Sequence, residues 1–354
     1  MNNGRWEYGS EFPLMQLRGA PSVTLPEPAR WYSLGRHAVR ALAPYSSGRL
    51  WLPCYFCPEV TSYWAQNFRI ERYCDTPQRQ APDWSTLRPA TSDLVVAVNF
   101  FGARDMSCWS AWRQGTDCVL VEDYTHDVSC PAISTSDADY GFASLRKTFA
   151  VPDGAILWSP RKLALPASLT TSARGAELKL AAMALKFEYL AGRRGSELKL
   201  AYRQMQVEGE RQLAESAPAT ASAYTMEVLR PGFPAEWQIR RRKNVLELIG
   251  GCAGNRNLEP LFVAWPKGAT PFAPVVVFGS RGERDAFRTE LRHHNIYCPI
   301  HWEVDGECAD ANDLAGRILT IPADQRYGSQ DVQHVLQALS HIRATMSNPS
   351  RVLR

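Results

Sequence analysis

The chain of 354 residues is 45% hydrophobic, which is enough to build the core of one large domain and a smaller second one. It has 40 Lys and Arg against 36 Asp and Glu, and the net charge of +4 is too small to suggest a nucleic-acid partner. No apolar run approaches the ~20 residues of a membrane span, and the polar start over residues 1–5 lacks the apolar core of a signal peptide. We therefore expect neither nucleic acid nor a membrane as a partner.

The cysteine content favours a reducing compartment. Nine cysteines are an odd number, and they are scattered without the spacing of a disulfide framework, which favours the cytoplasm. Cys54 and Cys57 form the one pair whose spacing suggests zinc, but no second Cys or His pair stands at ligand spacing. We therefore expect no metal site, and buried thiols beside a ligand pocket instead.

The N-terminal part begins with an arm and continues with a candidate phosphate site. Residues 1–29 are rich in proline, glycine and polar residues and are expected to form an arm over the main domain. A turn then leads into a helical pattern over residues 38–42, and free backbone N–H groups at such a helix start attract phosphate. This helix start is therefore a candidate phosphate site; an ordinary helix start with a surface arginine is the alternative.

Strand and helix signals alternate from residue 50 to residue 157, which indicates a mainly parallel sheet with helices on both faces. Ligands of open α/β sheets bind at the carboxyl ends of the strands. The apolar run Cys118–Val121 reads as a buried strand that delivers Asp123 and His126 at its carboxyl end. Further along, Lys147 lies in a polar turn between two short apolar runs.

An acid at one strand end and a lysine on a later strand-end loop are what pyridoxal phosphate (PLP) requires. The lysine forms an imine with the cofactor aldehyde, and a neighbouring cation such as Arg146 helps to keep its amine free of a proton. A carboxylate beside the pyridine nitrogen keeps the ring protonated, and Asp123 fits that role. The alternatives are a cap or turn for Asp123, a satisfied loop histidine for His126 and a plain turn residue for Ser144.

At these positions the sequence resembles the DegT/StrS-type aminotransferases, PLP enzymes of the aspartate-aminotransferase fold that mostly place amino groups on nucleotide-linked keto sugars. Glu122–His126 is similar to the family's Glu-Asp-x-x-His/Gln, and Ser144–Lys147 to its Schiff-base lysine loop. Leu52–Pro58 is similar to the segment that lays a side chain on the cofactor ring, and Val96–Gly102 to the strand before the Asp strand. The similarities follow the family order over roughly residues 30 to 160 and 235 to 340.

The resemblance implies a role for each matched residue. Asp123 pairs with the pyridine nitrogen, His126 lies near the phenolic oxygen, and Tyr55 or Phe56 stacks on the ring. Ser144 contacts the phosphate, and the resemblance makes Gly35, Arg36 and His37 the first phosphate-binding turn. His301 and Trp302 stand where family members line the substrate pocket, although packing at the domain interface would explain an aromatic pair equally well. The sequence departs from the family in having three residues, not five, from the serine to the lysine, and no clear partner-chain loop between residues 214 and 232.

The C-terminal half predicts helices and a smaller domain. Residues 172–215 read as an exposed amphipathic helix pair. A helix with a basic run begins at Trp237, and its apolar face is expected at 239, 245, 246 and 249. We predict three parts: an arm over 1–29, a PLP-binding large domain over 30–235, and a small C-terminal α/β domain over 236–354, with further helices at 284–291 and 329–342 and strands at 275–278 and 318–321.

The sequence therefore predicts an α/β protein with a three-layer α/β/α large domain of the PLP-transferase type and a small α/β domain. The resemblance implies a homodimer with active sites at the interface, PLP on Lys147, an amino acid donor, and a keto sugar or small ketone as acceptor. Two alternatives stay open. One is other carbanion chemistry in the same fold (dehydration, elimination or oxidation), and the other is a silent relative that serves as a binding module, against which the intact Asp123 and Lys147 pair argues.

Overall fold

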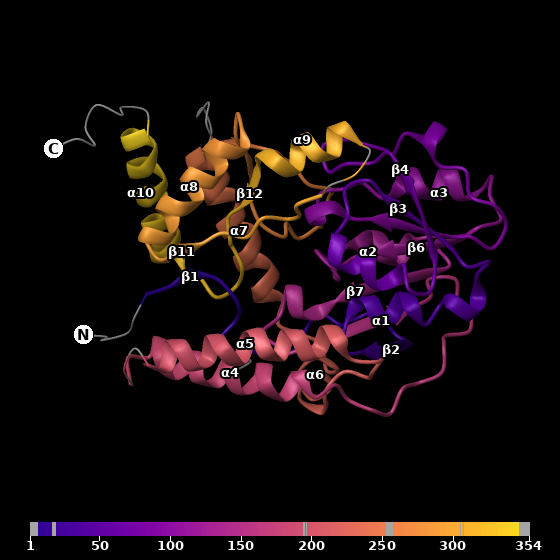
Figure 1. Cartoon of the computed structure of the whole chain (residues 1–354), viewed down its shortest axis with the longest axis horizontal. Coiled ribbons are helices and arrows are strands. Elements are labelled where there is room, and N and C mark those ends of the chain that lie inside the picture. Colours follow the sequence, from indigo (N-terminus) through magenta and orange to yellow (C-terminus); the bar gives the residue numbers. More distant parts are fainter. Residues whose placement is uncertain are drawn as a thin grey trace.

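The computed structural model describes residues 6–15, 19–193, 195, 197–252, 258–304, 306 and 308–346. The polar start over residues 1–5 lies outside these ranges. Figure 1 shows a large domain built on a central sheet, a smaller helical and stranded domain beside it, and a pair of long helices below both.

The large domain is organised around one seven-stranded sheet. Its five strands from β3 to β7 are parallel to one another, whereas β8 runs antiparallel to β7, and β2 antiparallel to β8. This is the mainly parallel sheet that the alternation of strand and helix signals predicts. In sheet order, the strands are β2 (Ala29–Tyr32), β8 (Ala155–Trp158), β7 (Tyr140–Ser144), β6 (Val119–Asp123), β5 (Leu94–Val98), β3 (Arg49–Pro53) and β4 (Arg69–Tyr73).

Both faces of this sheet are buried, because successive residues of each strand contribute to two different cores. Val96 and Phe142 pack on one face with residues of α1 and α2, and Val95 and Ala143 pack on the other with residues of α3 and α6. The period of two confirms the predicted three-layer arrangement. The helices of the outer layers are α1 (Gly35–Arg40), α2 (Pro58–Trp64), α3 (Ser107–Arg113) and α6 (Ala223–Leu229).

Short 3-10 helices follow several strands and turn the chain at the edges of the sheet. The one that matters most for the site is η5, because it begins at the residue after β7. The 3-10 helices are η1 (Ala43–Tyr45), η2 (Trp84–Thr86), η3 (Phe100–Gly102), η4 (Pro131–Thr135) and η5 (Leu145–Lys147).

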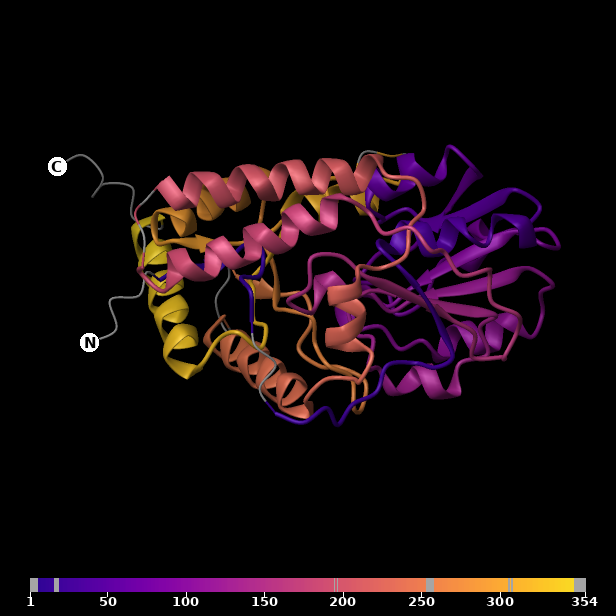
Figure 2. The same cartoon turned by 90° about the horizontal axis from the view of Figure 1, so that it is seen from below.

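Two long helices, α4 (Gly175–Leu190) and α5 (Glu197–Glu215), run side by side beneath both domains (Figures 1 and 2). They cross closely at two glycines. A Cβ atom on Gly175 would lie 2.4 Å from the carbonyl oxygen of Gly209, so any larger residue at that position would push the helices apart.

The faces of this helix pair differ from the exposed amphipathic pair that the sequence predicts. Lys179 and Lys186 are buried, while the apolar Leu200 and Val207 are 65% and 68% exposed. The physical reason is the N-terminal arm, which places acidic side chains against the helices: Lys186 Nζ lies 3.1 Å from an oxygen of Glu7. A hydrophobicity pattern alone cannot anticipate that a distant acid will neutralise a buried lysine.

Over its described residues, the small domain contains a three-stranded antiparallel sheet with the order β12-β10-β9 and four helices. The N-terminal arm joins this domain as well, since β1 pairs in parallel with β11. Val23 of the arm also bridges to Phe233, so the arm touches both parts of the molecule. The elements are β1 (Tyr8–Gly9), α7 (Ala235–Cys252), β9 (Glu259–Pro260), β10 (Val275–Val277), α8 (Arg281–His293), β11 (Ile296–Tyr297), α9 (Ala309–Arg317), β12 (Ile318–Thr320) and α10 (Ser329–Met346).

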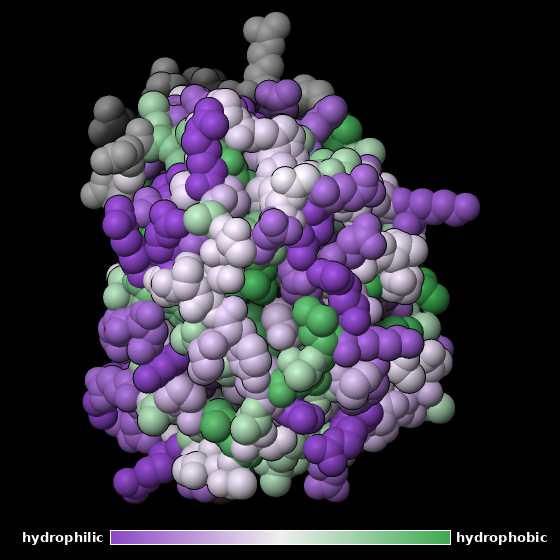
Figure 3. All heavy atoms as spheres, turned by 90° about the vertical axis from the view of Figure 1, so that its right-hand side faces the viewer, coloured by the Kyte–Doolittle hydropathy of each residue, from purple (hydrophilic) through white to green (hydrophobic). Residues whose placement is uncertain are grey.

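Figure 3 looks onto the large domain from the side opposite the small domain. On this face hydrophobic side chains lie in small groups among hydrophilic ones. Of the helices in the described ranges, none has the length and apolar character needed to cross a bilayer.

Candidate active site

Lys147 is the last residue of η5, directly after β7. Its side chain lines a cavity of about 770 Å³ that is bounded by both domains, the α4/α5 pair and the N-terminal arm. The surrounding protein and the adjacent Arg146 guanidinium lower the pKa of Lys147, and Glu210 partly opposes them. The free amine, which is the nucleophilic form, is therefore favoured.

Arg146, which the sequence places beside Lys147 as a source of positive charge, is held by α5. Its two Nη atoms donate to the carboxylate of Glu210 at 2.6 and 2.7 Å. Lys179 of α4 also donates to Glu210, at 3.2 Å, and to Glu11 of the arm, at 2.6 Å. Burial raises the pKa of Glu210, but these cations outweigh it and hold the pKa well below its usual value. The network ties both helices and the arm to the lysine loop.

Asp123 ends β6, and it lies opposite Phe142 in the parallel register with β7. Its carboxylate is buried and accepts a hydrogen bond from the backbone N–H of Thr125 at 2.8 Å. Burial raises the pKa of Asp123 to about 6, and no cation of the described residues contributes to this shift. Such a carboxylate is prepared to pair with a buried N–H⁺ group.

His126 is buried three residues further on. Its Nδ1 accepts a hydrogen bond from the backbone N–H of Phe101 at 3.0 Å, so Nε2 is the nitrogen that can carry the hydrogen. Its ring lies between aromatic neighbours, with centroids 5.1 Å from Phe101 and 4.3 Å from Phe272. Burial, together with the nearby His301 and Lys147, lowers the pKa of His126 well below its usual value. The ring is therefore a neutral donor.

The start of α1 lies against the end of β7, as the predicted phosphate site requires. A Cβ atom on Gly35 would lie only 3.3 Å from Cβ of Ser144. The side chains of the next two residues turn into the protein. The Arg36 guanidinium lies 5.6 Å from the centroid of a tyrosine ring, and Nδ1 of His37 is 2.9 Å from Oγ of Ser33. Burial lowers the pKa of His37 to about 4, so it is neutral.

The aromatic candidates from the two ends of the chain meet at the domain boundary. The centroid of the Trp302 ring lies 5.6 Å from that of Tyr55 and 5.9 Å from that of Phe56. Beside them, Nδ1 of His301 lies 3.0 Å from Oγ1 of Thr320, and burial lowers the pKa of His301 to about 3. The proximity agrees with both interpretations of these residues, a pocket wall and an interface.

The predicted residues do not all reach the cavity. Among the described residues that line it are Lys147 and His301. His126 lies behind His301, and the centroids of their two rings are 6.0 Å apart. Asp123 and Ser144 are buried at the sheet edge from which the lysine loop departs.

Sequence reasoning missed Arg241, which it places in the charged side of α7. The structure buries Arg241, and its Nη2 donates to the carbonyl of Thr148 at 2.8 Å and to Oε1 of Gln325 at 2.6 Å. The predicted apolar face is wrong at Ile239 and Leu246, which are exposed. Helical spacing could have identified Arg241 as buried, because residue 241 shares a helical stripe with the buried residues 245, 248 and 252.

Sequence reasoning also missed how strongly basic the cavity is. Of the residues that the structure describes, nine basic and three acidic ones line it, and most belong to segments far from Lys147 in the sequence. The basic residues are Arg146, Lys147, Lys179, Lys199, Arg203, Arg241, Arg288, Arg292 and Arg326, and the acidic ones are Glu11, Glu210 and Asp324.

No family model and no curated protein matches this chain. Solved structures do resemble it over most of its length. The aminotransferase TlmJ from Streptoalloteichus hindustanus is 17% identical with a TM-score of 0.58, over 90% of this chain and 86% of its own. Spr1654 from Streptococcus pneumoniae, assigned as a sugar aminotransferase, is 13% identical in its PMP form with a TM-score of 0.61, over 98% of this chain and 100% of its own.

A DegT DnrJ EryC1 StrS aminotransferase from Brucella abortus is 11% identical, with a TM-score of 0.53 over 88% of this chain and 85% of its own. The chain has the fold of these aminotransferases. The predicted PLP-transferase architecture is thereby confirmed.

Proposed function

We propose that the protein is a PLP-dependent aminotransferase that moves an amino group from an amino acid to a keto sugar or a small ketone in a biosynthetic pathway. The observation that carries the proposal is the placement of Asp123 and Lys147 at the ends of neighbouring parallel strands, the carboxylate buried and the amine open to a cavity. Spr1654 has been solved in both a PLP form and a PMP form, the two cofactor forms between which an aminotransferase alternates.

The residues fit this cofactor. Asp123 is a buried carboxylate, and no cation among the described residues contributes to its pKa shift. It would pair with the protonated pyridine nitrogen. His126, a neutral ring with its hydrogen on Nε2, would donate to the phenolic oxygen. Ser144 and the backbone of Gly35 and Arg36 would hold the phosphate at the sheet edge.

When bound, PLP supplies a ring that draws electrons from the carbon bearing the amino group. Lys147 attaches the cofactor, and after its release the amine moves a proton to and from that carbon as general base and acid. Its lowered pKa makes the unprotonated amine, the form that attaches the cofactor and takes up the proton, more populated than at the usual pKa. His301, which is neutral, stands beside the amine at the cavity wall without adding charge.

The basic lining of the cavity favours the binding of anionic substrates. Arg288 and Arg292 of α8 and Lys199 and Arg203 of α5 line the part that is built by the small domain and the long helices. Clustered guanidinium and ammonium groups favour carboxylate or phosphate, so the donor's carboxylate and an acidic acceptor would both be attracted.

We also propose a homodimer and a cytoplasmic location. The exposed Leu200 and Val207 lie seven residues apart on α5, with the exposed Phe187 on the adjacent α4, and such an apolar strip suits a subunit contact. Light scattering of the full chain, compared with Leu200→Glu, measures the assembly directly. The cytoplasm remains an inference from the scattered cysteines.

The test of the function is a half-reaction. The PLP-loaded full chain is mixed with a panel of amino acids in the absence of any acceptor. An aminotransferase converts the visible absorbance of the bound cofactor to a near-ultraviolet form and releases one keto acid per site. An eliminating enzyme regenerates the starting spectrum and releases ammonia, and a silent binding module shows no change with any donor. Either result with the whole panel would overturn the proposal.

A further inference from the structure

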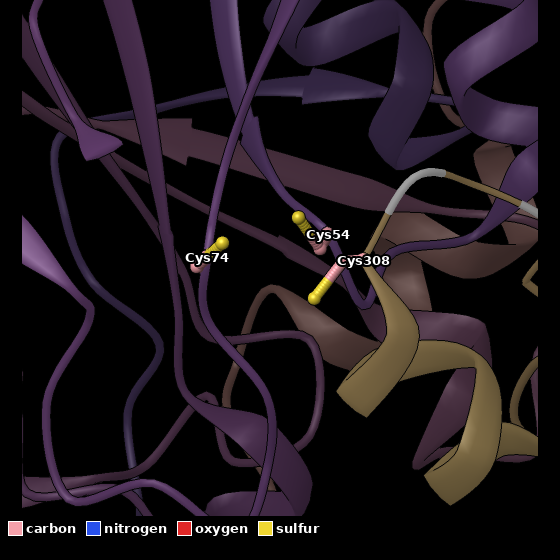
Figure 4. A group of neighbouring side chains, drawn as sticks. All are labelled: Cys54, Cys74 and Cys308. Atoms are coloured by element: carbon pink, nitrogen blue, oxygen red, sulfur yellow. The ribbon is translucent and has the colours of Figure 1, made fainter.

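Three cysteines that are far apart in the sequence meet at the boundary between the two domains. Cys54 follows β3, Cys74 follows β4, and Cys308 precedes α9 of the small domain (Figure 4). Their sulfur atoms all lie within 4.8 Å of one another. Cys57, which the sequence pairs with Cys54 as a possible zinc motif, is not a member of this group.

Three thiols in one place suit a thiophilic metal ion better than a disulfide. A disulfide uses two sulfur atoms and leaves the third over, whereas a tetrahedral zinc site takes several thiolates at about 2.3 Å, which places the sulfur atoms roughly 3.8 Å apart. The observed separation of at most 4.8 Å needs a small contraction to reach that geometry. All three residues are partly accessible, so an ion can enter.

The surroundings favour a divalent cation bound by thiolates. The Arg72 guanidinium donates to the carbonyl of Pro53, the residue before Cys54, at 3.0 Å. Three thiolates with one divalent cation leave a single negative charge, which this guanidinium can balance. Thiols release their protons when they bind the ion, so its affinity rises with pH.

The cluster joins segments that also carry the aromatic contact between the domains. Cys54 is next to Tyr55, and Cys308 lies six residues after Trp302, whose ring centroid is 5.6 Å from that of Tyr55. A salt bridge of 2.9 Å joins Arg79, which lies five residues after Cys74, to Asp310 of α9. Among the described residues, the lining of the Lys147 cavity does not include the three cysteines.

We propose that Cys54, Cys74 and Cys308 bind one Zn²⁺ or a similarly thiophilic divalent cation, with water or another small ligand in the fourth position. The ion clamps the start of α9 to the strand ends of the large domain. Among the described residues, this site shares no residue with the lining of the Lys147 cavity.

The experiment uses the reduced, PLP-loaded full chain and Zn²⁺ alone, in competition with a chromophoric chelator. We expect one Zn²⁺ per chain, bound more tightly as the pH rises. Cys54→Ser, Cys74→Ser and Cys308→Ser should each lower the affinity by more than about 100-fold, the upper end of what the loss of an outer-shell partner costs. Cys108→Ser, which removes a partly accessible thiol outside the cluster, should bind as the parent does.

A second measurement needs no variant. Iodoacetamide labelling of the folded parent, followed by peptide mapping, should be slowed by Zn²⁺ at residues 54, 74 and 308 and unchanged at Cys108. Failure of the reduced parent to retain Zn²⁺ against the chelator would overturn the proposal, and so would equal loss of binding in Cys108→Ser or unaltered labelling of the three cysteines. None of these results depends on whether the amino-transfer half-reaction succeeds.

Discussion

Two walls of the Lys147 cavity are built in different ways. On the sheet side, Asp123 ends β6 and Lys147 follows β7, so the register of two neighbouring strands sets their positions. On the helical side, Glu210 of α5 binds Arg146 of the lysine loop, and Lys179 of α4 binds both Glu210 and Glu11 of the arm. Strand register fixes the positions of the groups on the sheet side, which suits groups that carry out chemistry. The long charged side chains of the helical side suit the adjustment of charge around the lysine. Each substitution below removes a group from one of the walls or from their support.

The largest effect is expected from Lys147→Ala on the sheet wall. The variant should lose covalent PLP and the conversion of the cofactor spectrum by any amino donor, since the attachment and the proton transfer both require this amine. Lys243→Ala, which removes an exposed lysine of α7 outside the described lining of the cavity, should keep the conversion. Conversion in Lys147→Ala at the parental rate would place the chemistry elsewhere.

Asp123→Asn tests the carboxylate that is buried behind the sheet wall. It should leave PLP attached but slow the half-reaction on the order of 10²-fold or more, because an amide cannot stabilise a protonated ring nitrogen as a carboxylate does. Stopped-flow absorbance with a saturating donor measures the step. A rate within a few fold of the parent would make Asp123 a structural residue.

Arg241→Met tests the support behind the lysine loop. Removing the guanidinium leaves a buried acceptor on Gln325 without its donor and weakens the hold on Thr148, which should lower the free energy of unfolding by about 1–3 kcal/mol. Lys243→Met, two residues along the same helix and exposed, should change it by less than about 0.5 kcal/mol. Urea unfolding measures the free energy of unfolding of both variants. An equal change in the two would mean that Arg241 contributes no more to stability than an exposed lysine does.

Glu210→Gln removes the acid of the helical wall. We expect a loss of about 1–2 kcal/mol of unfolding free energy at neutral pH, less than the ~3–5 kcal/mol of a fully buried pair, because the Glu210 side chain is 37% exposed and water screens it. The folded state lowers the pKa of Glu210, so its contribution is complete above the usual value of 4.5 and is lost as the pH falls toward the folded pKa. The stabilities of parent and variant should therefore converge in acid.

Glu210→Gln should also change the pKa of Lys147. Glu210 raises the pKa of Lys147, so its removal should lower that pKa and speed the covalent capture of PLP near neutral pH. Glu208→Gln, which removes an acid that binds Arg211 on the outer surface, should leave the capture rate unchanged. Slower capture in Glu210→Gln would mean that the helical wall acts on the lysine in the opposite sense.

The sheet wall could be predicted from the sequence because its signals are local. Short apolar runs mark β6 and β7, and Asp123 and Lys147 follow from where those runs end. The same logic places Gly35 beside Ser144, since both lie at one edge of the sheet. A local sequence signal does not predict in which direction a side chain points. The side chain of His37 points into the protein, where it pairs with Ser33.

The helical wall could not be predicted, because its partners are far apart in the chain. Lys186 is buried on account of Glu7, and Arg241 on account of Gln325, and neither acceptor can be found from helical periodicity. The cluster that contains Cys54 and Cys308 has the same origin, as no short spacing joins those residues. Such contacts depend on the packing of the whole chain.

The most direct test of the central claim is to find which lysine carries PLP. Within the described part of the chain, three lysines line the cavity and are candidates: Lys147, Lys179 and Lys199. Borohydride reduction of the PLP-loaded chain, followed by peptide mapping, identifies the modified residue. The account predicts a single label on Lys147 at the end of β7. A label on Lys179 or Lys199, or no label at all, would contradict it.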